Sequence, residues 1–219
     1  MITDRLGIGM TSQRARDRLI AQLQNMGIRS AEVLELIGNV PRHLFVDEAL
    51  ASRAYENTAL PIGHGQTISQ PYIVARMTEA LIEGGPLRRV LEIGGGCGYQ
   101  TAILARLAEQ VYCIERIDAL AIRLRERMRS LRCLNIHVRH GDGSNGWPRH
   151  APYDGILVAA APREVPLALR EQLALGGRLV IPYGEPGDQK LIVVLRNESG
   201  FEERFLDAVS FVPLVAGAA

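Results

Sequence analysis

The hydrophobic positions of the first 85 residues recur mostly at helical spacing. Three stretches follow the 3.6-residue period of an amphipathic helix, and their apolar faces consist of Leu19, Ile20, Leu23 and Met26, of Val33, Leu34 and Ile37, and of Ile73, Val74, Met77 and Leu81. Ser30 is placed to cap the second helix, and Pro71 suits the first turn of the third. Residues 55–69 show no period and are rich in glycine and proline, which predicts an ordered loop.

Residues 86–219 alternate between two other patterns. Short apolar runs predict strands over residues 89–93, 111–114, 135–138, 155–158 and 177–181, and helical stripes lie over residues 99–107, 117–131 and 165–173. This alternation is typical of an α/β fold whose mostly parallel sheet is covered on both faces. Residues 191–195 and 205–212 predict an antiparallel pair at its end. The length of 219 residues suits a single domain over 1–219, with N-terminal helices and a loop over 1–85 and an α/β core over 86–219.

Composition excludes several classes of protein. Hydrophobic residues make up 47% of the chain and charged residues 22%, which is inconsistent with a disordered, collagen-like or coiled-coil chain. The net charge of +1 argues against a protein built mainly to bind phosphate backbones or anionic membranes. No run approaches the roughly 20 apolar residues of a membrane span, and residues 1–10 lack the apolar core of a signal peptide. We therefore expect a cytoplasmic, monomeric protein that binds neither nucleic acid nor membrane.

Cysteine and histidine spacing predicts neither a disulfide framework nor a metal site. The three cysteines, Cys97, Cys113 and Cys133, contain no Cys-x-x-Cys pair. The histidines at 137, 140 and 150 lack metal-ligand spacing with any acid or cysteine. A basic run at 123, 125, 127, 129 and 132 falls between the apolar positions of one predicted helix, so a solvated helix face explains it better than a nucleic-acid patch.

The clearest chemical signal is a glycine-rich turn between a predicted strand and a predicted helix, Glu92-Ile93-Gly94-Gly95-Gly96-Cys97-Gly98-Tyr99. Glycine lets the backbone approach a ligand closely, and a helix N-terminus offers free amides. The glycines at 94, 96 and 98 do not match the G-x-G-x-x-G of dinucleotide-binding folds, because Tyr99 takes the place of the third glycine. No Gly-Lys-Ser/Thr follows, so a Walker A loop is excluded as well.

Three acidic residues accompany this turn, each near the carboxyl end of a predicted strand. Glu92 lies two residues before Gly94 and suits a cationic ligand better than a pyrophosphate. Glu115 ends the second strand, where a carboxylate can accept both hydroxyls of a ribose. Asp142-Gly143 follows the third strand, on the edge where an adenine would rest. A ligand with a ribose diol, a cationic group and no phosphate is S-adenosyl-L-methionine, although each feature alone also fits a plain turn or a solvated surface pair.

With these features on hand, the chain resembles a known family. Glu92-Ile93-Gly94-x-Gly96-x-Gly98 is similar to motif I of the class I methyltransferases, which have a Rossmann-like fold. The loop Leu60-Pro61-Ile62-Gly63-His64-Gly65-Gln66-Thr67-Ile68-Ser69-Gln70-Pro71 resembles the narrower signature of protein-L-isoaspartate O-methyltransferases. Further similarities lie at 41–46, 141–143, 176–182 and 211–214, so the resemblance covers residues 12–215.

The resemblance implies transfer of a methyl group from S-adenosyl-L-methionine to the free α-carboxylate of an L-isoaspartyl residue in a damaged protein or peptide. The ester then closes to a succinimide that hydrolyses partly to normal aspartate, which makes the family a repair system. Its cofactor-binding residues would be Glu92, Gly94, Gly96, Gly98, Glu115, Asp142 and Gly143. The chain departs from the family pattern at Gly95, where Thr or Ser is usual, at Cys97 and Ala159, where small polar residues or Thr are usual, and at Ser210.

On the acceptor side, Ser69 is predicted to lie nearest the transfer and to orient the acceptor carboxylate through its hydroxyl. It is not expected to act as a nucleophile, because no Gly-x-Ser-x-Gly elbow surrounds it; its alternative role is to cap the helix that opens near Pro71. Thr67 and His64, on the same loop, are predicted to bind substrate, with a purely bracing role as the alternative for His64. Val212 is predicted to end the last strand and to pair with the substrate backbone.

Two other functions remain open at this point. A methyltransferase acting on RNA or on a small molecule would share the glycine-rich turn, but nucleic-acid amino-methyltransferases usually carry an Asn/Asp-Pro-Pro-Tyr/Phe tetrad where this chain reads Ala159-Ala160-Ala161-Pro162. A non-catalytic binder that keeps the nucleoside fold as a scaffold is the second alternative. Loss of Glu115 or of residues 67–71 would favour the binder, and the chain retains both.

Overall fold

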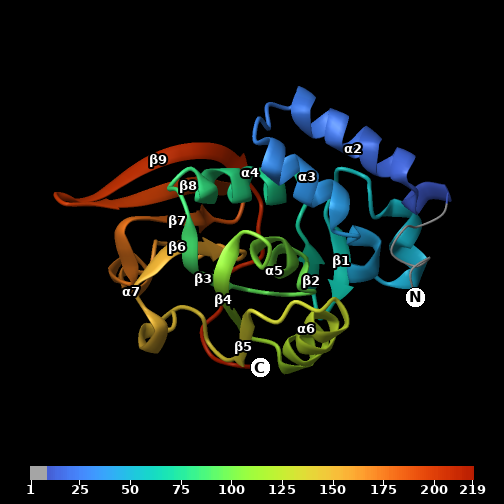
Figure 1. Ribbon diagram of the computed structural model, residues 1–219. Coiled ribbons are helices and arrows are strands. Elements are labelled where there is room, and N and C mark those ends of the chain that lie inside the picture. Colours follow the sequence, from blue (N-terminus) through green and yellow to red (C-terminus); the bar gives the residue numbers. More distant parts are fainter. Residues whose placement is uncertain (1–8) are drawn as a thin grey trace.

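A computed structural model describes residues 9–219 of the chain and shows a seven-stranded sheet with helices packed against it (Figure 1). The strands are β3 (Leu87–Ile93), β4 (Ala108–Glu115), β5 (Ile136–His140), β6 (Tyr153–Val158), β7 (Leu173–Glu185), β8 (Asp188–Asn197) and β9 (Gly200–Val209). They lie in the order β5-β4-β3-β6-β7-β8-β9. Neighbouring strands from β5 to β7 pair in parallel, whereas β8 pairs antiparallel with both β7 and β9. The predicted α/β sheet with an antiparallel end is therefore confirmed.

Six α-helices and four short 3-10 helices complete the described chain. The α-helices are α2 (Gln13–Asn25), α3 (Ala31–Asn39), α4 (Pro71–Ile82), α5 (Tyr99–Leu104), α6 (Asp118–Ser130) and α7 (Leu167–Glu171). The 3-10 helices are η1 (Gly9–Thr11), η2 (Arg42–Phe45), η3 (Glu48–Arg53) and η4 (Pro148–His150). None of the helices within residues 9–219 is both long enough and apolar enough to cross a membrane. The expectation that residues 1–10 carry no signal peptide concerns mostly residues 1–8, which lie outside the described part of the chain.

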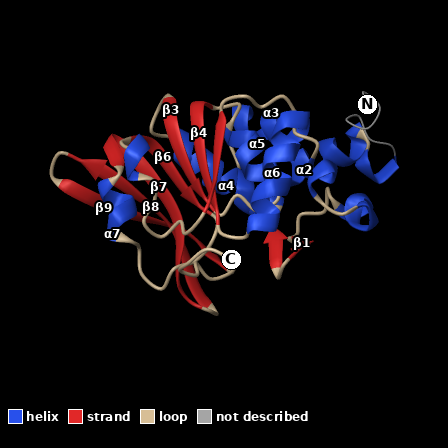
Figure 2. Ribbon diagram, turned by 90° about the horizontal axis from the view of Figure 1, so that it is seen from below, coloured by secondary structure: helices blue, strands red, loops and turns tan. Residues whose placement is uncertain are grey.

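The two faces of the sheet are covered unequally. On one face, Val90, Val111 and Leu157 pack against buried side chains of α4 and α5. On the other face, Ile93, Ile114 and their neighbours pack against the short α7 and against the loop that carries Trp147. Figure 2 shows most of the helices gathered on one side, with α7 apart from them. Alternation of side chains along each strand supplies an apolar residue to both faces, which explains the continuous apolar runs in the sequence.

Residues 60–68 form a β-hairpin rather than the strandless loop that the sequence predicted. Strands β1 (Leu60–Gly63) and β2 (Gln66–Ile68) pair antiparallel, with Gly63 opposite Gln66. His64 and Gly65 form the two-residue turn, with φ of +54° and +68°. Positive φ at both central residues matches the right-handed twist of a hairpin. The strands are too short for a period-2 pattern to stand out from the loop composition around them.

The last strand ends earlier than predicted. β9 stops at Val209, so Val212 does not end a strand, and residues 210–214 run past the sheet edge as an irregular segment. There the amide of Ala161 donates to the Val212 carbonyl, and the amide of Leu214 donates to the Ala161 carbonyl, at 2.8 and 2.9 Å. Pro213 lacks an amide hydrogen and cannot extend a regular ladder. The predicted helices at 99–107 and 165–173 are also shorter in the structure, at Tyr99–Leu104 and Leu167–Glu171.

A buried arginine fixes the N-terminal elements against the α/β core. Arg42 is fully buried, and its guanidinium donates hydrogen bonds to the carbonyls of Ala54 and Thr58 at 2.9 and 3.3 Å. It also lies over the ring of Tyr99, with its central carbon 4.9 Å from the ring centroid. Burial lowers the pKa of Arg42, and carbonyl dipoles and the aromatic face compensate its charge, with no carboxylate paired to it among residues 9–219.

Replacing this arginine should destabilise the fold. We expect Arg42→Ala to lower the free energy of unfolding by ~3 kcal/mol, because two buried carbonyls lose their charged donor and the ring of Tyr99 loses its cover. Urea unfolding followed by circular dichroism measures the change. Arg53→Ala is the control, since the ion pair of Arg53 with Glu56, at 2.9 Å, is exposed, and its loss should cost less than about 0.5 kcal/mol. Equal losses of unfolding free energy in the two variants would contradict the stabilising role assigned to Arg42.

Candidate functional site

The site is a cavity of about 760 Å³ at the carboxyl ends of the central strands. Ile93 of β3 and Ile114 of β4 line its floor, and the β1–β2 hairpin and the segment 208–215 line its sides. A cavity of this size is typical of a small-molecule or cofactor site. The carboxyl edge of a parallel sheet is where ligands of open α/β folds bind.

The glycine-rich turn forms one wall of this cavity. Gly94, Gly96 and Gly98 all adopt left-handed backbone, with φ of +84°, +53° and +88°, which explains why these positions carry no side chain. Gly94 and Gly96 line the cavity, but Gly98 does not. A β-carbon at Gly98 would lie 2.9 Å from Cε of Met128, so this glycine serves the close packing of α6.

The packing around Gly95 explains why this chain has glycine where the family usually has Thr or Ser. A β-carbon at this position would lie 2.4 Å from Sγ of Cys113 and 2.5 Å from Cδ1 of Leu124. Both neighbours are fully buried, so neither can give way without disturbing the core. The side chain of Cys113 thus occupies the space that a Thr or Ser at 95 would need.

Glu115 stands at the end of β4 and lines the cavity. Its Oε2 accepts a hydrogen bond from the Gly96 amide and its Oε1 accepts one from the Ile117 amide, both at 2.8 Å. The carboxylate therefore ties the glycine-rich turn to the end of the neighbouring strand. A carboxylate offers about four acceptor positions, so capacity remains for two further donors such as hydroxyls.

Glu92 lies behind the glycine-rich turn rather than in the cavity wall. Its side chain is fully buried, it is not among the residues that line the cavity, and neither carboxylate oxygen has a hydrogen-bond partner among the described residues. Burial raises the pKa of this carboxyl to about 7, and the nearby Glu115 charge acts in the same direction, against the weaker influence of Thr101 and Cys113. Glu92 therefore lies one layer behind the cavity wall, and its predicted contact with a cationic ligand stays a prediction.

The two residues of the Asp142-Gly143 turn have different surroundings, because Gly143 faces the cavity and the Asp142 side chain does not line it. Gly143 lines the cavity, and a β-carbon there would lie 2.3 Å from Cγ2 of Ile93. The Asp142 carboxylate instead accepts from the amides of Gly217 and Ser144, both at 2.8 Å, and these two bonds lower its pKa. Asp142 thereby holds the C-terminal segment, whose residue Val215 also lines the cavity.

On the opposite side, Ser69 and Thr67 both line the cavity. The alternative role of Ser69 as a helix cap is not realised, because Gln70 occupies the cap position of α4 without a side-chain bond. Asn57 takes over that role, since its Oδ1 accepts from the Tyr72 amide at 3.0 Å. The hydroxyl of Ser69 therefore remains available to a ligand in the cavity.

The other two predicted substrate residues lie differently. His64 sits at the tip of the hairpin, is exposed and does not line the cavity. Val212 does line it, although its carbonyl already accepts from the Ala161 amide. Cavity residues that the sequence analysis missed include Asn57, Gln70, Gln100 and Arg116. Gln70 lies within the 60–71 motif, where no role was assigned to it, and the other three are single polar residues without a motif, so only the fold brings the four to one place.

Two further side chains singled out by the sequence, Cys97 and Arg127, meet at the glycine-rich turn, where Cys97 also lines the cavity. Burial raises the pKa of the Cys97 thiol, which is the opposite of the lowering that its position before a helix could have caused. Arg127, from the basic run on α6, is half-buried and donates to the Cys97 carbonyl at 2.6 Å. Its guanidinium also lies 5.3 Å from the ring centroid of Phe45. Arg123, Arg129 and Arg132 are exposed, as expected for a solvated face.

A mostly parallel sheet, a glycine-rich turn after β3 and an acidic residue at the end of the neighbouring β4 together define a class I S-adenosylmethionine-dependent methyltransferase. The family model described as protein-L-isoaspartate(D-aspartate) O-methyltransferase matches residues 13–219. The chain therefore belongs to the protein-L-isoaspartate(D-aspartate) O-methyltransferase family and is an enzyme of that family.

Individual relatives agree with this assignment. The chain is 61% identical over 211 residues to a protein-L-isoaspartate O-methyltransferase of Halorhodospira halophila, with 96% of both chains covered. It is 58% identical over 208 residues to the enzyme of that name from Pseudomonas paraeruginosa, covering 95% of this chain and 99% of the relative. A crystal structure of a protein-L-isoaspartate O-methyltransferase from Plasmodium falciparum in complex with S-adenosyl-L-homocysteine superposes with a TM-score of 0.79 at 26% identity, covering 91% of this chain and 98% of the other.

The burial of Glu92 predicts a pH-dependent stability. Between pH 4.5 and about 7 the folded chain keeps a proton that the unfolded chain has released, so stability falls as pH rises through this window. Glu92→Gln removes this penalty, and we expect it to exceed the wild type in free energy of unfolding by ~3 kcal/mol at pH 8 and to equal it near pH 4. Urea titrations at the two pH values measure the difference. A difference that is the same at both would contradict the raised pKa.

Proposed function

We propose that this protein transfers a methyl group from S-adenosyl-L-methionine to the α-carboxylate of L-isoaspartyl residues in damaged proteins and peptides, and so initiates their repair through a succinimide. The observation that carries the proposal is the shared cavity. Ser69 and Thr67 line the same space as Gly94, Gly96 and Glu115. A donor bound on the glycine side and an acceptor bound on the hydroxyl side would therefore meet inside it. Family membership and the names of the relatives support this substrate class.

The residues on the glycine side suit the cofactor. Glu115 would accept the ribose hydroxyls with the acceptor capacity that its two amide bonds leave. Gly94 and Gly96 would let the backbone approach the ligand, and Gly143 would leave room for the adenine. Gly98, Glu92 and Asp142 would act indirectly, through the packing of α6, the support of the turn and the anchoring of the C-terminal segment. When bound, S-adenosyl-L-methionine supplies an electrophilic methyl group on a cationic sulfonium.

On the acceptor side, the chemistry requires orientation rather than proton transfer. A carboxylate with an ordinary pKa near 4 is already ionised at pH 7, so no general base or enzyme nucleophile is needed. The Ser69 hydroxyl would donate to one carboxylate oxygen and direct the other toward the methyl group, and Thr67 would shape the same pocket. Alignment of this kind contributes up to ~7–11 kcal/mol to a bimolecular reaction. The apolar side chains of Ile62, Ile73 and Val74 in the lining would limit access of water.

The remaining assignments are extensions of this proposal. His64, at the hairpin tip, would brace the turn or meet the substrate outside the cavity. Val212, which lines the cavity, would contact the substrate from the opposite wall. We also propose a monomer that works in the cytoplasm. The unpaired state of Cys97, Cys113 and Cys133 supports a reducing compartment.

A pair of peptides tests the proposed function. The enzyme should methylate a peptide that contains one L-isoaspartyl residue and should leave its L-aspartyl twin unmodified, as measured by transfer of a labelled methyl group. It should also bind S-adenosyl-L-homocysteine in isothermal titration calorimetry. Binding of this nucleoside without methylation of the isoaspartyl peptide would favour a non-catalytic binder or a methyltransferase for another substrate.

Removing one hydroxyl tests the acceptor site. We expect Ser69→Ala to lower kcat/KM for the isoaspartyl peptide tenfold to over a hundredfold, since loss of a hydrogen bond to a charged group costs ~1–3 kcal/mol. Its affinity for S-adenosyl-L-homocysteine should stay at the wild-type value. In the same assay Arg53→Ala, which removes an exposed ion pair away from the cavity, should retain the rate within about twofold. An undiminished rate in Ser69→Ala would remove Ser69 from the mechanism.

A further inference from the structure

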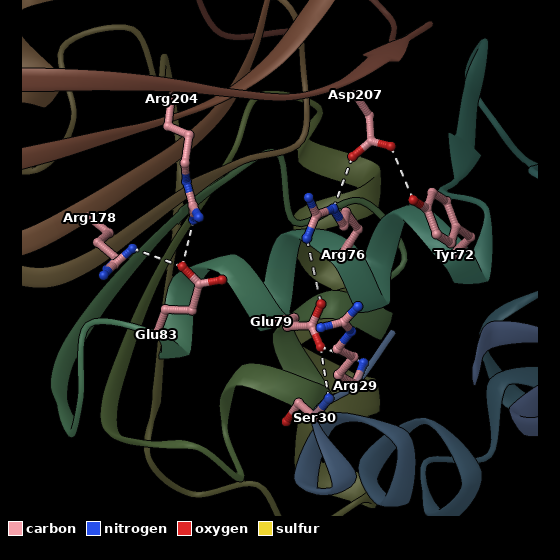
Figure 3. Close-up of polar contacts among 9 residues, drawn as sticks. All are labelled: Arg29, Ser30, Tyr72, Arg76, Glu79, Glu83, Arg178, Arg204 and Asp207. Carbon is pink, nitrogen blue, oxygen red and sulfur yellow. Dashed lines mark hydrogen bonds and ion pairs between the residues drawn. The ribbon is translucent and has the colours of Figure 1, made fainter. Parts of the chain in front are cut away.

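A single carboxylate joins the two walls of the substrate side of the cavity. Asp207 lies in β9, three residues before Ser210, which lines the cavity. Its Oδ1 accepts from the hydroxyl of Tyr72 and its Oδ2 accepts from Nε of Arg76, both at 3.0 Å. Figure 3 shows the two side chains rising from α4 toward Asp207 on the strand above. The contact spans 131 and 135 positions of sequence, so only the tertiary fold makes it.

The α4 end of this link is continuous with the wall that carries Ser69. Tyr72 is the second residue of α4, and α4 begins one residue after Gln70. The Tyr72 amide donates to Oδ1 of Asn57, and Nε2 of Gln70 donates to the Asn57 carbonyl, both at 3.0 Å. Tyr72 is thus held from two sides, by Asn57 through its backbone and by Asp207 through its hydroxyl.

The β9 end of the link is continuous with the opposite wall. Val209, Ser210, Phe211 and Val212 all line the cavity. Beyond β9, Gln189 holds the segment, because its side-chain amide accepts from the Phe211 amide at 2.6 Å and donates to the Phe211 carbonyl at 3.2 Å. Before Ser210, Asp207 is the polar residue nearest the cavity that bonds to side chains of α4. Apolar contacts of Leu206, Val209 and Phe211 with the cluster that α4 belongs to hold the two walls together, and the Asp207 carboxylate adds a directional polar link between them.

We propose that Asp207 is a positioning residue for substrate binding, which sets the width of the cavity mouth between the Ser69 wall and the 208–212 wall through Tyr72 and Arg76. This inference rests on the proposed function, because the mouth matters only if an isoaspartyl segment enters there. Burial and the neighbouring carboxylate raise the pKa of Tyr72, so its hydroxyl stays protonated and remains a donor to Asp207 at neutral pH.

The network continues to the N-terminal helices. Arg76 also pairs with Glu79 at 3.6 Å, and Oε1 of Glu79 accepts from the amides of Arg29 and Ser30 at 2.7 Å each. Asp207 is therefore the point where the C-terminal wall joins a polar chain that runs along α4 to the start of α3 (Figure 3).

The other end of α4 provides a matched control. Glu83 follows the last turn of the helix and accepts from Arg178 of β7 at 3.1 Å and from Arg204 of β9 at 2.5 Å. This pairing joins the same helix to the same strand as Asp207 does, but none of its three residues lines the cavity. Glu83→Gln therefore weakens the docking of β9 on α4 without touching the mouth.

The experiment compares Asp207→Ala, Tyr72→Phe and Glu83→Gln with the wild type. We expect Asp207→Ala to raise KM for the isoaspartyl peptide about tenfold and Tyr72→Phe about threefold, with kcat within about threefold of wild type, because the reacting groups remain and only their approach is loosened. Asp207→Glu should reverse part of the rise in KM.

Two controls accompany these variants. Affinity for S-adenosyl-L-homocysteine should not change in any variant, and Glu83→Gln should keep the wild-type KM even if its Tm falls. Tyr72→Phe added to Asp207→Ala should cause little further change, since the two share one bond.

Amide hydrogen exchange gives a readout that does not depend on turnover. Asp207→Ala should speed exchange in both segments 66–72 and 208–212, whereas Glu83→Gln should leave these segments at the wild-type rate. Two results would overturn the inference while the wild type remains active and the proposed function stands. One is an unchanged KM in Asp207→Ala, and the other is a rise in KM in Glu83→Gln as large as that in Asp207→Ala. A wild type that does not methylate the isoaspartyl peptide would overturn the proposed function and the role of Asp207 with it.

Discussion

The cofactor side of the cavity depends on the parallel register of β3 and β4. That register sets Ile93 opposite Ile114, so the glycine-rich turn leaves β3 beside the end of β4, where Glu115 stands. The Gly94 amide donates to the Ile114 carbonyl, and the Gly96 amide donates to Glu115, both at 2.8 Å. A turn with several left-handed glycines has high conformational entropy when unfolded and few contacts of its own. The Glu115 carboxylate at the end of β4, together with the bond from Arg127 to the Cys97 carbonyl, helps to hold the turn in one conformation.

The charge distribution around the cavity follows from this arrangement. Among residues 9–219, the charged side chains that line it are Glu115 and Arg116, both at the β4 end. The side formed by residues 66–70 and 208–212 offers hydroxyls, amides and apolar groups instead. An anionic acceptor bound in that half would be attracted to the positively charged sulfonium of the donor. A site of low polarity strengthens this electrostatic attraction. Glu92, the one further carboxylate beneath the turn, lies in surroundings that raise its pKa to about 7, so it adds little negative charge below that pH.

The acceptor half is assembled from segments that are distant in the sequence. The β1–β2 hairpin and the start of α4 supply one wall, and the chain after β9 supplies the other. Asn57, Gln189 and Asp207 hold these segments through side-chain bonds to backbone or to polar side chains. Such bonds replace the regular ladders that irregular segments lack, because buried backbone groups need partners whether or not they belong to a strand.

The sequence alone determined the parallel sheet, the glycine-rich turn, and the motif of residues 60–71 that carries Thr67 and Ser69, although not the hairpin that this motif forms. These features are local: hydrophobic period, glycine where positive φ is required, and a contiguous motif can each be read without knowing what packs against them. Glu115 belongs to the same group, because the end of a strand is visible in the pattern of its own residues.

Only the tertiary structure decided the rest. In the fold, Glu92 lies behind the turn, and the Asp142 carboxylate accepts a hydrogen bond from the C-terminal segment. His64 lies outside the cavity, and the last strand ends before Val212. The fold also brings Asp207 to Tyr72 and Arg76 across more than 130 positions. Which face of a strand a side chain takes, and which distant group satisfies it, depends on packing partners whose identity no local pattern contains.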